Sequence, residues 1–305
     1  MISVIMSTYK EPEHFLRSAI ESILKQTYTD FEFIIILDNP DNMLHKNIIN
    51  GYALNDQRIQ FYVNEKNLGL TKSLNKGLKY AQRKYIARMD ADDISSEDRF
   101  EKQIRYLRDN DLDLIGGNTQ IINEDGESLY SIKKIPTNEQ VIKKVIRYNQ
   151  CIAHPTWLAK RDLFIKLNGY REMPLCEDYD FTLRAILAGY RVSNINDTVL
   201  KYRMTSQSIS RNNLLRQYLY MEYITREYRH GKVAQIIDAH TYVDYKFSEV
   251  KSERYKKANV IFNKALNNIE KKQLFGFFVN GVKLVFTSFT FLKKTYRLIR
   301  VSLNH

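Results

Sequence analysis

The chain of 305 residues is 44% hydrophobic and 12% aromatic, which excludes a disordered protein and allows one large domain or two modest ones. Its only cysteines, Cys151 and Cys176, exclude a disulfide framework and favour a reducing, cytoplasmic location. The net charge of +12 favours acidic partners such as nucleotide phosphates, nucleic acid or an anionic membrane.

Five apolar runs of strand length recur about every 28 residues, at 2–6, 31–37, 59–63, 84–89 and 112–117. Helical patterns with one apolar stripe lie between them at 14–26, 69–82 and 96–110, the last with Ser96 as its expected N-cap. This alternation predicts an α/β domain with a Rossmann-like, mostly parallel sheet flanked by helices. In such sheets, ligands bind beyond the carboxyl ends of the strands.

The pattern changes after residue 118. The sequence around Asp125 and Gly126 predicts a β-hairpin, and residues 137–149 and 177–189 predict helices, the second closed by Gly189. Beyond residue 211 nearly all of the sequence has a helical pattern. We therefore expect an α/β domain over residues 1–210 and a helical region over 211–305.

The stretch RMDADDIS, residues 88–95, places three aspartates directly after the fourth apolar run. Because side chains alternate along an extended backbone, Asp90 and Asp92 are expected on one side and Ala91 in the core. Two carboxylates at a strand tip suit Mg²⁺ or Mn²⁺ shared with the phosphates of a ligand. The alternative is that these acids cap the following helix, with Arg88 neutralising them.

Polar residues also follow the first three strands, at the same predicted edge of the sheet. They are Thr8, Tyr9 and Glu11, then Asp38, then Asn67, Gly69 and Lys72. Gly69 opens a helix, where backbone amides could approach a phosphate. Taken singly, Thr8 or Glu11 is equally explained as a helix cap, and Gly69 as part of a turn. The four loops together predict one binding edge.

Seven segments, in order over residues 1–205, carry a family resemblance: SVIMSTYKEP, LKQTYTDFEFIIILD, NLGLTKSLNKGL, YIARMDADDIS, HPTWLAKRDLF, NGYRE and CEDYDFTLR. On these segments the chain resembles glycosyltransferase family 2, the nucleotide-sugar transferases of the glycosyltransferase A fold. Within the family it is similar to bacterial enzymes that build capsule, exopolysaccharide or lipo-oligosaccharide. The QxxRW motif and transmembrane helices of the processive synthases are not found, so we expect a hexosyltransferase that adds a single sugar.

The resemblance implies a role for each matching position. A UDP-sugar donor would lie against Thr8, Tyr9, Glu11, Asp38, Asn67, Gly69, Lys72, Arg88 and Asp90, and Asp90 and Asp92 would ligate Mn²⁺ or Mg²⁺. Asp178 would be the catalytic base, with Glu177 and Asp180 as alternatives or as acceptor ligands. An acid favoured by a helix dipole is the structural explanation for Asp178. The second strand ends LDNPDN, where family members often have an aspartate pair and a Gly-Ser turn.

A nucleotide sugar needs only one protein carboxylate as a base. Its diphosphate is already a good leaving group once a cation matches the charge, so no general acid is required. Asp178 would take the proton of an acceptor hydroxyl as that oxygen attacks the anomeric carbon opposite the diphosphate. The reaction would therefore invert the configuration, and the acceptor would be a glycan or a lipid-linked saccharide.

Three further residues are weaker candidates for contact with the acceptor or substrate. His154 precedes a proline in CIAHPTW and Trp157 is the only tryptophan, and core packing is the alternative for each. Arg203, or Arg211, could close over phosphates, with solvated loop charge as the alternative.

The last 35 residues hold seven Lys and Arg residues and no acid. Residues 271–300 are predicted as one amphipathic helix, which Asn280 and Lys283 interrupt too strongly for it to span a membrane. We expect it to lie on the anionic inner face of the cell membrane. Packing on the domain or against a second copy in a homodimer is the alternative.

Two other functions are weighed against the glycosyltransferase. A sugar-nucleotide nucleotidyltransferase would carry a Gly-rich basic loop after the first strand, where this chain has STYKEPEHF. A nucleic-acid-binding protein is not expected, because the charge is concentrated in a Phe-rich tail and no nucleic-acid module is present.

Overall fold

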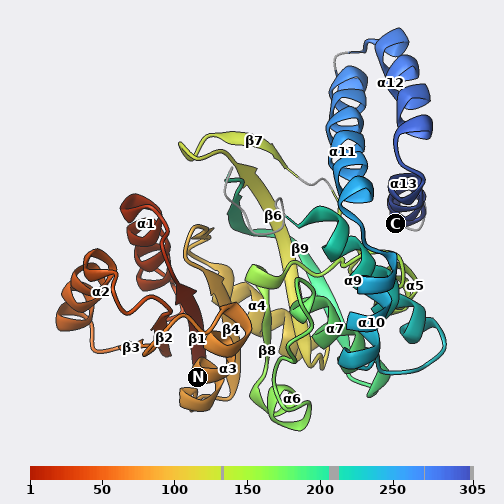
Figure 1. Ribbon diagram of the computed structural model, residues 1–305. Coiled ribbons are helices and arrows are strands. Elements are labelled where there is room, and N and C mark those ends of the chain that lie inside the picture. Colours follow the sequence, from red (N-terminus) through yellow and green to blue (C-terminus); the bar gives the residue numbers. More distant parts are fainter. Residues whose placement is uncertain (132–133, 206–212, 271, 303–305) are drawn as a thin grey trace. The chain divides into compact units, whose positions relative to one another are not determined.

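The computed structural model describes residues 1–131, 134–205, 213–270 and 272–302 (Figure 1). The strands are β1 (Ile2–Thr8), β2 (Phe31–Leu37), β3 (Ile59–Val63), β4 (Tyr85–Asp90), β5 (Ile94–Ser95), β6 (Leu114–Ile122), β7 (Ser128–Ser131), β8 (Leu158–Lys160) and β9 (Val192–Arg203). The helices are α1 (Glu13–Leu24), α2 (Met43–Asn55), α3 (Leu70–Tyr80), α4 (Arg99–Asp109), α5 (Glu139–Val145), α6 (Arg161–Lys166), α7 (Glu177–Leu187), α9 (Leu214–Arg229), α10 (Ile236–Lys246), α11 (Glu249–Glu270), α12 (Leu274–Thr287) and α13 (Phe289–Ser302), with a 3₁₀ turn η1 at His154–Thr156.

The described strands form one sheet in the order β3-β2-β1-β4-β8-β6-β9-β5, with β7 paired to β6. The first four of these are mutually parallel, which confirms the α/β prediction, and they can be followed from left to right in Figure 1. Strand β8 is antiparallel to both β4 and β6, and β6 and β9 are parallel. The carboxyl ends of β1, β2 and β4 therefore lie at one edge, as expected from the sequence.

The two faces of the sheet are covered by different helices. Val4 and Met6 of β1 belong to one buried cluster with Leu16 of α1 and Phe100 of α4. On the other face, α3 approaches closely, since a Cβ at Gly77 would lie 2.6 Å from Cγ2 of Ile5. Alternate residues of β1 thus pack against helices on opposite faces of the sheet. Both faces are buried, which explains why the apolar run of β1 is continuous.

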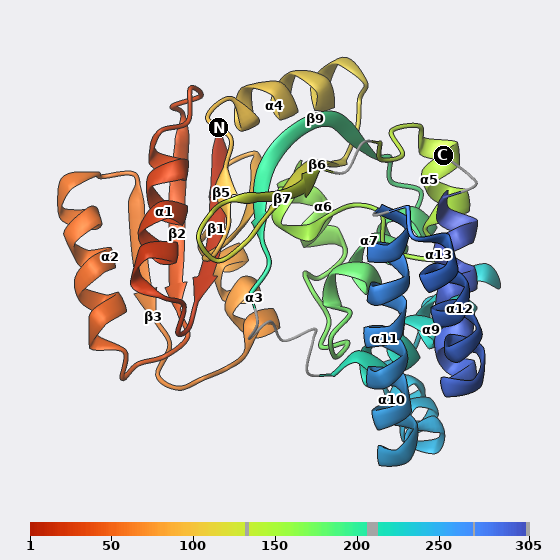
Figure 2. The ribbon, with the colours of Figure 1, turned by 90° about the horizontal axis from the view of Figure 1, so that it is seen from above.

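Strand β9 is 12 residues long and strongly curved (Figure 2). It pairs along β6 with register shifts around Asn118, and then pairs antiparallel with β5. The last residue of β9, Arg203, therefore contacts Asp92 and Asp93, the residues between β4 and β5.

One predicted cap is wrong. Helix α4 begins at Arg99 after Asp98, whereas Ser96 lies before the helix and donates its hydroxyl to the carbonyl of Thr198 at 3.1 Å. The Ser96 amide also donates to the Val199 carbonyl at 3.0 Å, so Ser96 continues the contact of β5 with β9 instead of capping the helix.

The chain divides into two compact units. The first comprises Met1–Lys144, Gln150–Glu172 and Glu177–Thr205, and the second comprises Val145–Asn149, Met173–Cys176 and the chain beyond Thr205. The second unit is helical in its described part, from α9 to α13. No helix in the described ranges combines the length and the apolar character that crossing a membrane requires.

The tail contains two helices, so the prediction of one continuous helix over 271–300 is wrong. Helix α12 ends before Ser288, which has extended backbone angles, and the Ser288 hydroxyl accepts a hydrogen bond from the amide of Phe291 at 3.3 Å. A serine that caps the next helix in this way explains the break. Helix α13 packs within its own unit, because Phe291 is fully buried and Arg297 donates to the Tyr148 carbonyl at 2.6 Å.

Candidate active site

The loop after β1 holds a carboxylate in a fixed position. Glu11 accepts hydrogen bonds from the Thr8 hydroxyl at 2.6 Å and from the Tyr9 amide at 2.8 Å. His45, from α2, donates Nε2–H to the Glu11 carbonyl at 2.8 Å, and its Nδ1 lies 3.0 Å from Thr8 Oγ1. Tyr9 remains partly exposed, so its ring is available to a ligand. Sequence reasoning missed His45, which lies far along the chain from both residues it contacts.

Asp38, at the end of β2, organises the loop after β3. Its carboxylate accepts the amides of Leu68 and Gly69, both at 2.8 Å, and the side-chain amide of Asn64 at 2.7 Å. Gly69 has φ +83°, a conformation that favours glycine. The Gly69 amide is thus committed to Asp38, which differs from the expected approach to a phosphate.

Two other residues of this region also have protein partners. The Asn67 side chain accepts the Gly69 amide at 3.0 Å, and the Lys72 ammonium lies 3.3 Å from the Glu172 carboxylate. The Lys72–Glu172 pair is exposed on both sides, so Lys72 can exchange partners at little cost.

The acidic stretch after β4 has the alternation expected from the sequence. Ala91 is buried in the core, while Asp90 and Asp92 are partly accessible. The guanidinium of Arg88, itself buried, forms an ion pair with Asp90. Burial, together with the charges of Asp90 and Glu11, raises the pKa of Asp92 to about 7. This stretch therefore holds more carboxylate groups than the single cation Arg88 can match.

The third aspartate, Asp93, is a structural residue. It is fully buried, and burial with the neighbouring charges of Asp90 and Asp92 raises its pKa well above the usual range. Its Oδ1 accepts the Arg203 amide at 2.8 Å. A neutral carboxyl group at this depth avoids the cost of burying a charge.

Arg203 holds the same loop through its side chain. Its guanidinium donates to the carbonyls of Asp92, Asn123 and Glu124 at 2.8–3.1 Å and lies 4.2 Å from the ring of Phe15. The buried guanidinium is therefore committed to backbone carbonyls, which corrects the expectation that Arg203 closes over phosphates. The alternative residue, Arg211, lies outside the described residues.

Helix α7 begins with two partly buried carboxylates, Glu177 and Asp178. Burial and the charge of Asp178 raise the pKa of Glu177 to about 7, and burial raises the pKa of Asp178. Asp178 is oriented by the amide of Tyr179 and by the side chain of Gln150, whose Nε2 also lies 3.1 Å from the Thr182 hydroxyl. Gln150 was not foreseen from the sequence.

The third acid of this helix, Asp180, has a different role. Its carboxylate accepts hydrogen bonds from Arg171 Nε at 3.0 Å and Arg184 Nε at 2.9 Å, and it is almost fully buried. Both carboxylate oxygens are thus committed to arginines, which removes Asp180 as an alternative base.

His154 and Trp157 belong to an aromatic cluster under the start of α7. His154 Nε2 lies 2.8 Å from the Tyr170 hydroxyl, and burial and Arg88 hold the pKa of His154 well below its usual value. Trp157 packs beside His154 and Phe181 and donates its indole N–H to the Ile152 carbonyl at 3.1 Å. Both are buried, so the structure favours core packing over contact with an acceptor.

Arg99 is a buried residue that sequence reasoning did not single out. Its guanidinium donates to the carbonyls of Arg88 and Trp157 at 2.9 and 3.2 Å and to the Gln103 side chain. Burial and the charge of Arg88 lower its pKa to about 9. Helix α4 thus fixes the end of β4 against the turn η1.

The carboxylates from these separate elements lie within electrostatic range of one another. The charge of Glu11 acts on Asp92, and the charge of Asp90 acts on Glu177. Burial raises the pKa of the Tyr170 hydroxyl. The charge of Arg88 lowers this pKa, and the charges of Asp178, Glu177 and Asp90 raise it further. Acids from the loop after β1, from the end of β4 and the loop after it, and from the start of α7 are therefore close enough for their charges to interact.

Comparison with known proteins identifies the family. Residues 3–167 match the family model described as glycosyl transferase family 2. This chain belongs to glycosyltransferase family 2. The match decides against the nucleotidyltransferase and the nucleic-acid-binding protein as alternatives.

Named relatives of this family 2 glycosyltransferase agree. It is 38% identical over 233 residues to an uncharacterised glycosyltransferase of Methanocaldococcus jannaschii, covering 76% of this chain and 80% of the relative. It is 36% identical to the O-antigen biosynthesis glycosyltransferase WbnJ of Escherichia coli, covering 75% of this chain and 89% of the relative.

Solved structures confirm the glycosyltransferase A fold. S. aureus TarS (residues 1–349), solved in complex with UDP, aligns over 99% of this chain and 88% of its own with a TM-score of 0.60 and 16% identity. The same protein in complex with UDP-GlcNAc also gives 0.60, at 18% identity.

Asp90 and Asp92 of this glycosyltransferase fit only part of a metal-ion coordination sphere. Among the described residues, no three His, Cys, Asp or Glu side chains converge to hold a metal ion. Two carboxylates suit a hard divalent cation that takes its remaining ligands from phosphate and water. The raised pKa of Asp92 agrees with a position where a cation would relieve charge repulsion.

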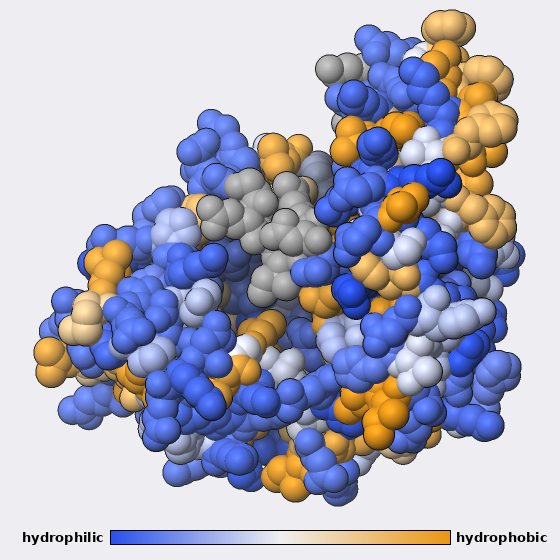
Figure 3. Space-filling model, viewed as in Figure 1, coloured by the Kyte–Doolittle hydropathy of each residue, from blue (hydrophilic) through white to orange (hydrophobic). Residues whose placement is uncertain are grey.

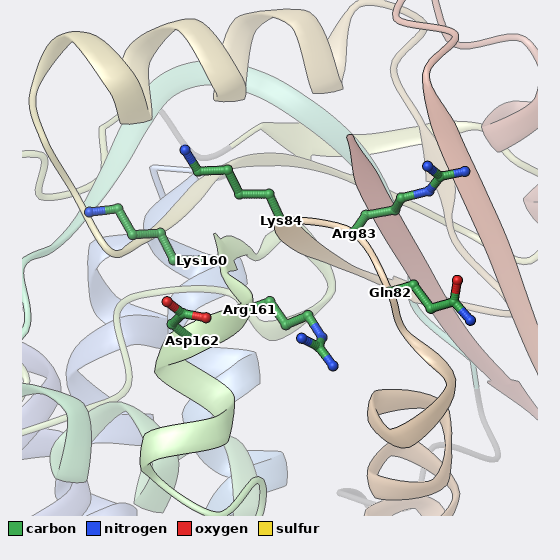
Figure 4. A pocket seen from close by; sticks show the side chains of 6 residues that line it. All are labelled: Gln82, Arg83, Lys84, Lys160, Arg161 and Asp162. Carbon is green, nitrogen blue, oxygen red and sulfur yellow. The ribbon is translucent and has the colours of Figure 1, made fainter.

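A separate cavity lies elsewhere in the first unit. It has a volume of about 310 Å³ and is lined by Gln82, Arg83, Lys84, Lys160, Arg161 and Asp162 (Figure 4). Lys84 directly precedes β4, so the cavity lies at the opposite edge of the sheet from Asp90. Lys160 is already paired there with Asp113 at 2.9 Å. Basic side chains at this edge take no part in the site after β4.

Proposed function

We propose that this glycosyltransferase moves one sugar from a UDP-sugar to a hydroxyl of a glycan or lipid-linked saccharide, with inversion and with Mn²⁺ or Mg²⁺, in surface polysaccharide biosynthesis. The observation that carries the proposal is the meeting of Glu11, Asp90 and Asp92 with Glu177 and Asp178 at one edge of the sheet. The catalytic part corresponds to the proposed domain 1–210.

Relatives support the substrate class. The E. coli protein WfgD is named UDP-Glc:alpha-D-GlcNAc-diphosphoundecaprenol beta-1,3-glucosyltransferase and is 30% identical over 215 residues, covering 70% of this chain and 80% of WfgD. Its name gives a UDP-sugar donor and a lipid-linked acceptor. The TarS complexes with UDP and UDP-GlcNAc add support for a uridine nucleotide.

In the proposed donor site, the Tyr9 ring and the Thr8–Glu11 turn lie beside the nucleoside. Asp38 shapes the neighbouring loop through Leu68 and Gly69. Arg88 fixes the carboxylate of Asp90, and Asp90 and Asp92 would hold the metal ion. That ion would match the charge of the departing diphosphate.

Asp178 is the proposed catalytic base. It takes the proton from the acceptor hydroxyl while that oxygen forms a bond to the anomeric carbon, and the bond from that carbon to the diphosphate breaks on the opposite side. Burial raises the pKa of Asp178, which strengthens it as a base, while Gln150 and the Tyr179 amide keep the carboxylate oriented. Glu177 is then available to bind acceptor hydroxyls.

We also propose that the enzyme works in the cytoplasm at the inner face of the cell membrane, where lipid-linked acceptors are presented. The basic C-terminal region, residues 211–305, would provide the membrane contact. The proposed site involves no nucleic acid, and a homodimer is the competing use of the tail.

A panel of nucleotide sugars, assayed for release of free nucleotide with wild type, Asp178→Asn and Asp162→Asn, tests the reaction. Asp162 is an exposed carboxylate at the opposite edge of the sheet and serves as the matched control. We expect turnover of a UDP-sugar, a loss of about 1,000-fold in kcat for Asp178→Asn with UDP binding retained, and no change for Asp162→Asn. Wild-type turnover by Asp178→Asn would remove this residue as the base, and turnover of other nucleotide sugars alone would remove UDP.

A further inference from the structure

Helix α12 carries an apolar face that no described part of its unit covers. Large side chains project from it into solvent, and Phe275 and Phe286 are 82% and 86% exposed. The face, called here the α12 face, consists of Leu274, Phe275, Phe278, Val282, Val285 and Phe286. Figure 3 shows apolar side chains gathered over α12.

These residues lie on one side of the helix. Their spacing follows the 3.6-residue period from Leu274 to Phe286, so within α12 they form one stripe wider than 100°. The opposite side packs against α11, where Leu284 is buried and a Cβ at Gly276 would lie 2.6 Å from the Asn268 side chain. The side of α12 that contacts α11 thus has smaller and less apolar residues, and the side with the phenylalanine rings is exposed to solvent.

The charged residues of the tail itself, after Glu270, all have one sign. The chain contains no acid after Glu270, and Lys272 and Lys283 are exposed, Lys283 at the border of the α12 face. Other tail cations are used within the unit, since Arg297 donates to the Tyr148 carbonyl and the Thr225 hydroxyl. The α12 face is therefore aromatic, with a basic border.

We propose that the α12 face docks on an anionic lipid bilayer, with α12 lying in the plane of the interface. The helix has 14 residues and a length of roughly 21 Å, less than the hydrocarbon thickness of about 30 Å, so it lies on the membrane and does not span it. Phenylalanine rings enter the acyl boundary while the lysines contact lipid phosphates.

A second copy of the chain is a poorer occupant of this face. A symmetric contact would bring two basic borders together with no acid of the tail to match them. Anionic lipid headgroups supply that missing charge. The inference rests on the second unit alone, so it stands or fails independently of the proposed reaction.

Vesicle flotation of the full chain tests the proposal. The variant Phe275→Ser/Phe278→Ser/Phe286→Ser removes the three most exposed rings of α12, and Leu54→Ser/Ile237→Ser/Tyr245→Ser changes similarly exposed side chains elsewhere as the matched control. Vesicles contain either phosphatidylcholine alone or a mixture with phosphatidylglycerol. Circular dichroism verifies that each variant is folded.

We expect wild type and control to float with anionic vesicles and the α12 variant to lose at least about tenfold in partitioning. Lys283→Glu, which leaves the apolar face intact, should weaken binding to anionic vesicles by roughly fivefold or more and have no such effect on phosphatidylcholine. Equal flotation of the α12 variant would overturn the proposal. So would a wild-type dimer in light scattering that the α12 substitutions dissociate, with no binding to vesicles.

Discussion

At the scale of single residues, the site holds several ionisable groups in buried surroundings, where the charged form is disfavoured. Asp92 and Glu177 each have a pKa of about 7, in both cases chiefly because of burial. Arg99 is buried without a carboxylate partner and donates to backbone carbonyls. Such groups are retained at the expense of stability, which is typical of residues selected for activity.

Gln150 gives a prediction about pH. Burial raises the pKa of Asp178, and the hydrogen bond from Gln150 opposes this increase because it stabilises the ionised form. Gln150→Leu removes the donor, so the pKa of Asp178 should increase further. Since the base acts in its ionised form, the acid limb of the kcat profile should move to higher pH by roughly one unit.

Steady-state kinetics from pH 5 to pH 9, with the UDP-sugar found active, would measure this shift. Gln60→Leu, in β3, is the control and should leave the profile unchanged. An unmoved acid limb in Gln150→Leu would show that Gln150 has no influence on the proton acceptor.

Site residues could be predicted from the sequence where a local pattern of neighbouring residues marks them, and not where their role depends on distant parts of the chain. Asp90 and Asp92 follow a strand whose alternation fixes their side, and Asp178 opens a recognisable helix. His45, Gln150 and Tyr170 act through partners 16 to 37 residues away, so no local pattern reveals them. For Arg203 and Trp157 the sequence left two explanations open, because the deciding factors, burial and backbone carbonyl partners, are tertiary.

At the scale of elements, strands β1 to β4 and helices α1, α3 and α4 were predictable because their apolar periods are clear, whereas helix α2 was missed. Strand β8 has only three residues and β5 has two, too few for a period, so the antiparallel pairings of these two strands could not be foreseen. The break at Ser288 was missed because the apolar stripe continues across it.

Two glycines give a stability prediction for elements. Gly77→Ala in α3 would place a Cβ 2.6 Å from Ile5 Cγ2, and we expect a loss of about 1–3 kcal/mol from overpacking against β1. Gly51→Ala in α2 meets no atom within 4 Å, and we expect a gain of about 0.5–1 kcal/mol from helix propensity. Urea denaturation measures both, and a shift of the same sign in the two variants would contradict the packing of α3 on β1.

At the scale of the molecule, one unit carries the family segments and the other carries the basic tail. The sheet brings loops from separate parts of the chain to one edge, which is why motifs spread over residues 1–205 describe a single site. The tail was predicted as a membrane-contacting element from charge and amphipathicity, and its division into α12 and α13 assigns the exposed apolar face chiefly to α12.

The central claim is that Asp90 and Asp92 hold a divalent cation that binds the donor diphosphate. Calorimetric titration of UDP into wild type, Asp92→Asn and Asp109→Asn, each with Mn²⁺ and with EDTA, tests it most directly. Asp109 is an exposed acid of α4 and serves as the control.

We predict that UDP binds wild type and Asp109→Asn with Mn²⁺, and that EDTA or Asp92→Asn weakens binding by about 100-fold. Binding of UDP that is equally tight in EDTA and unaffected by Asp92→Asn would contradict the account.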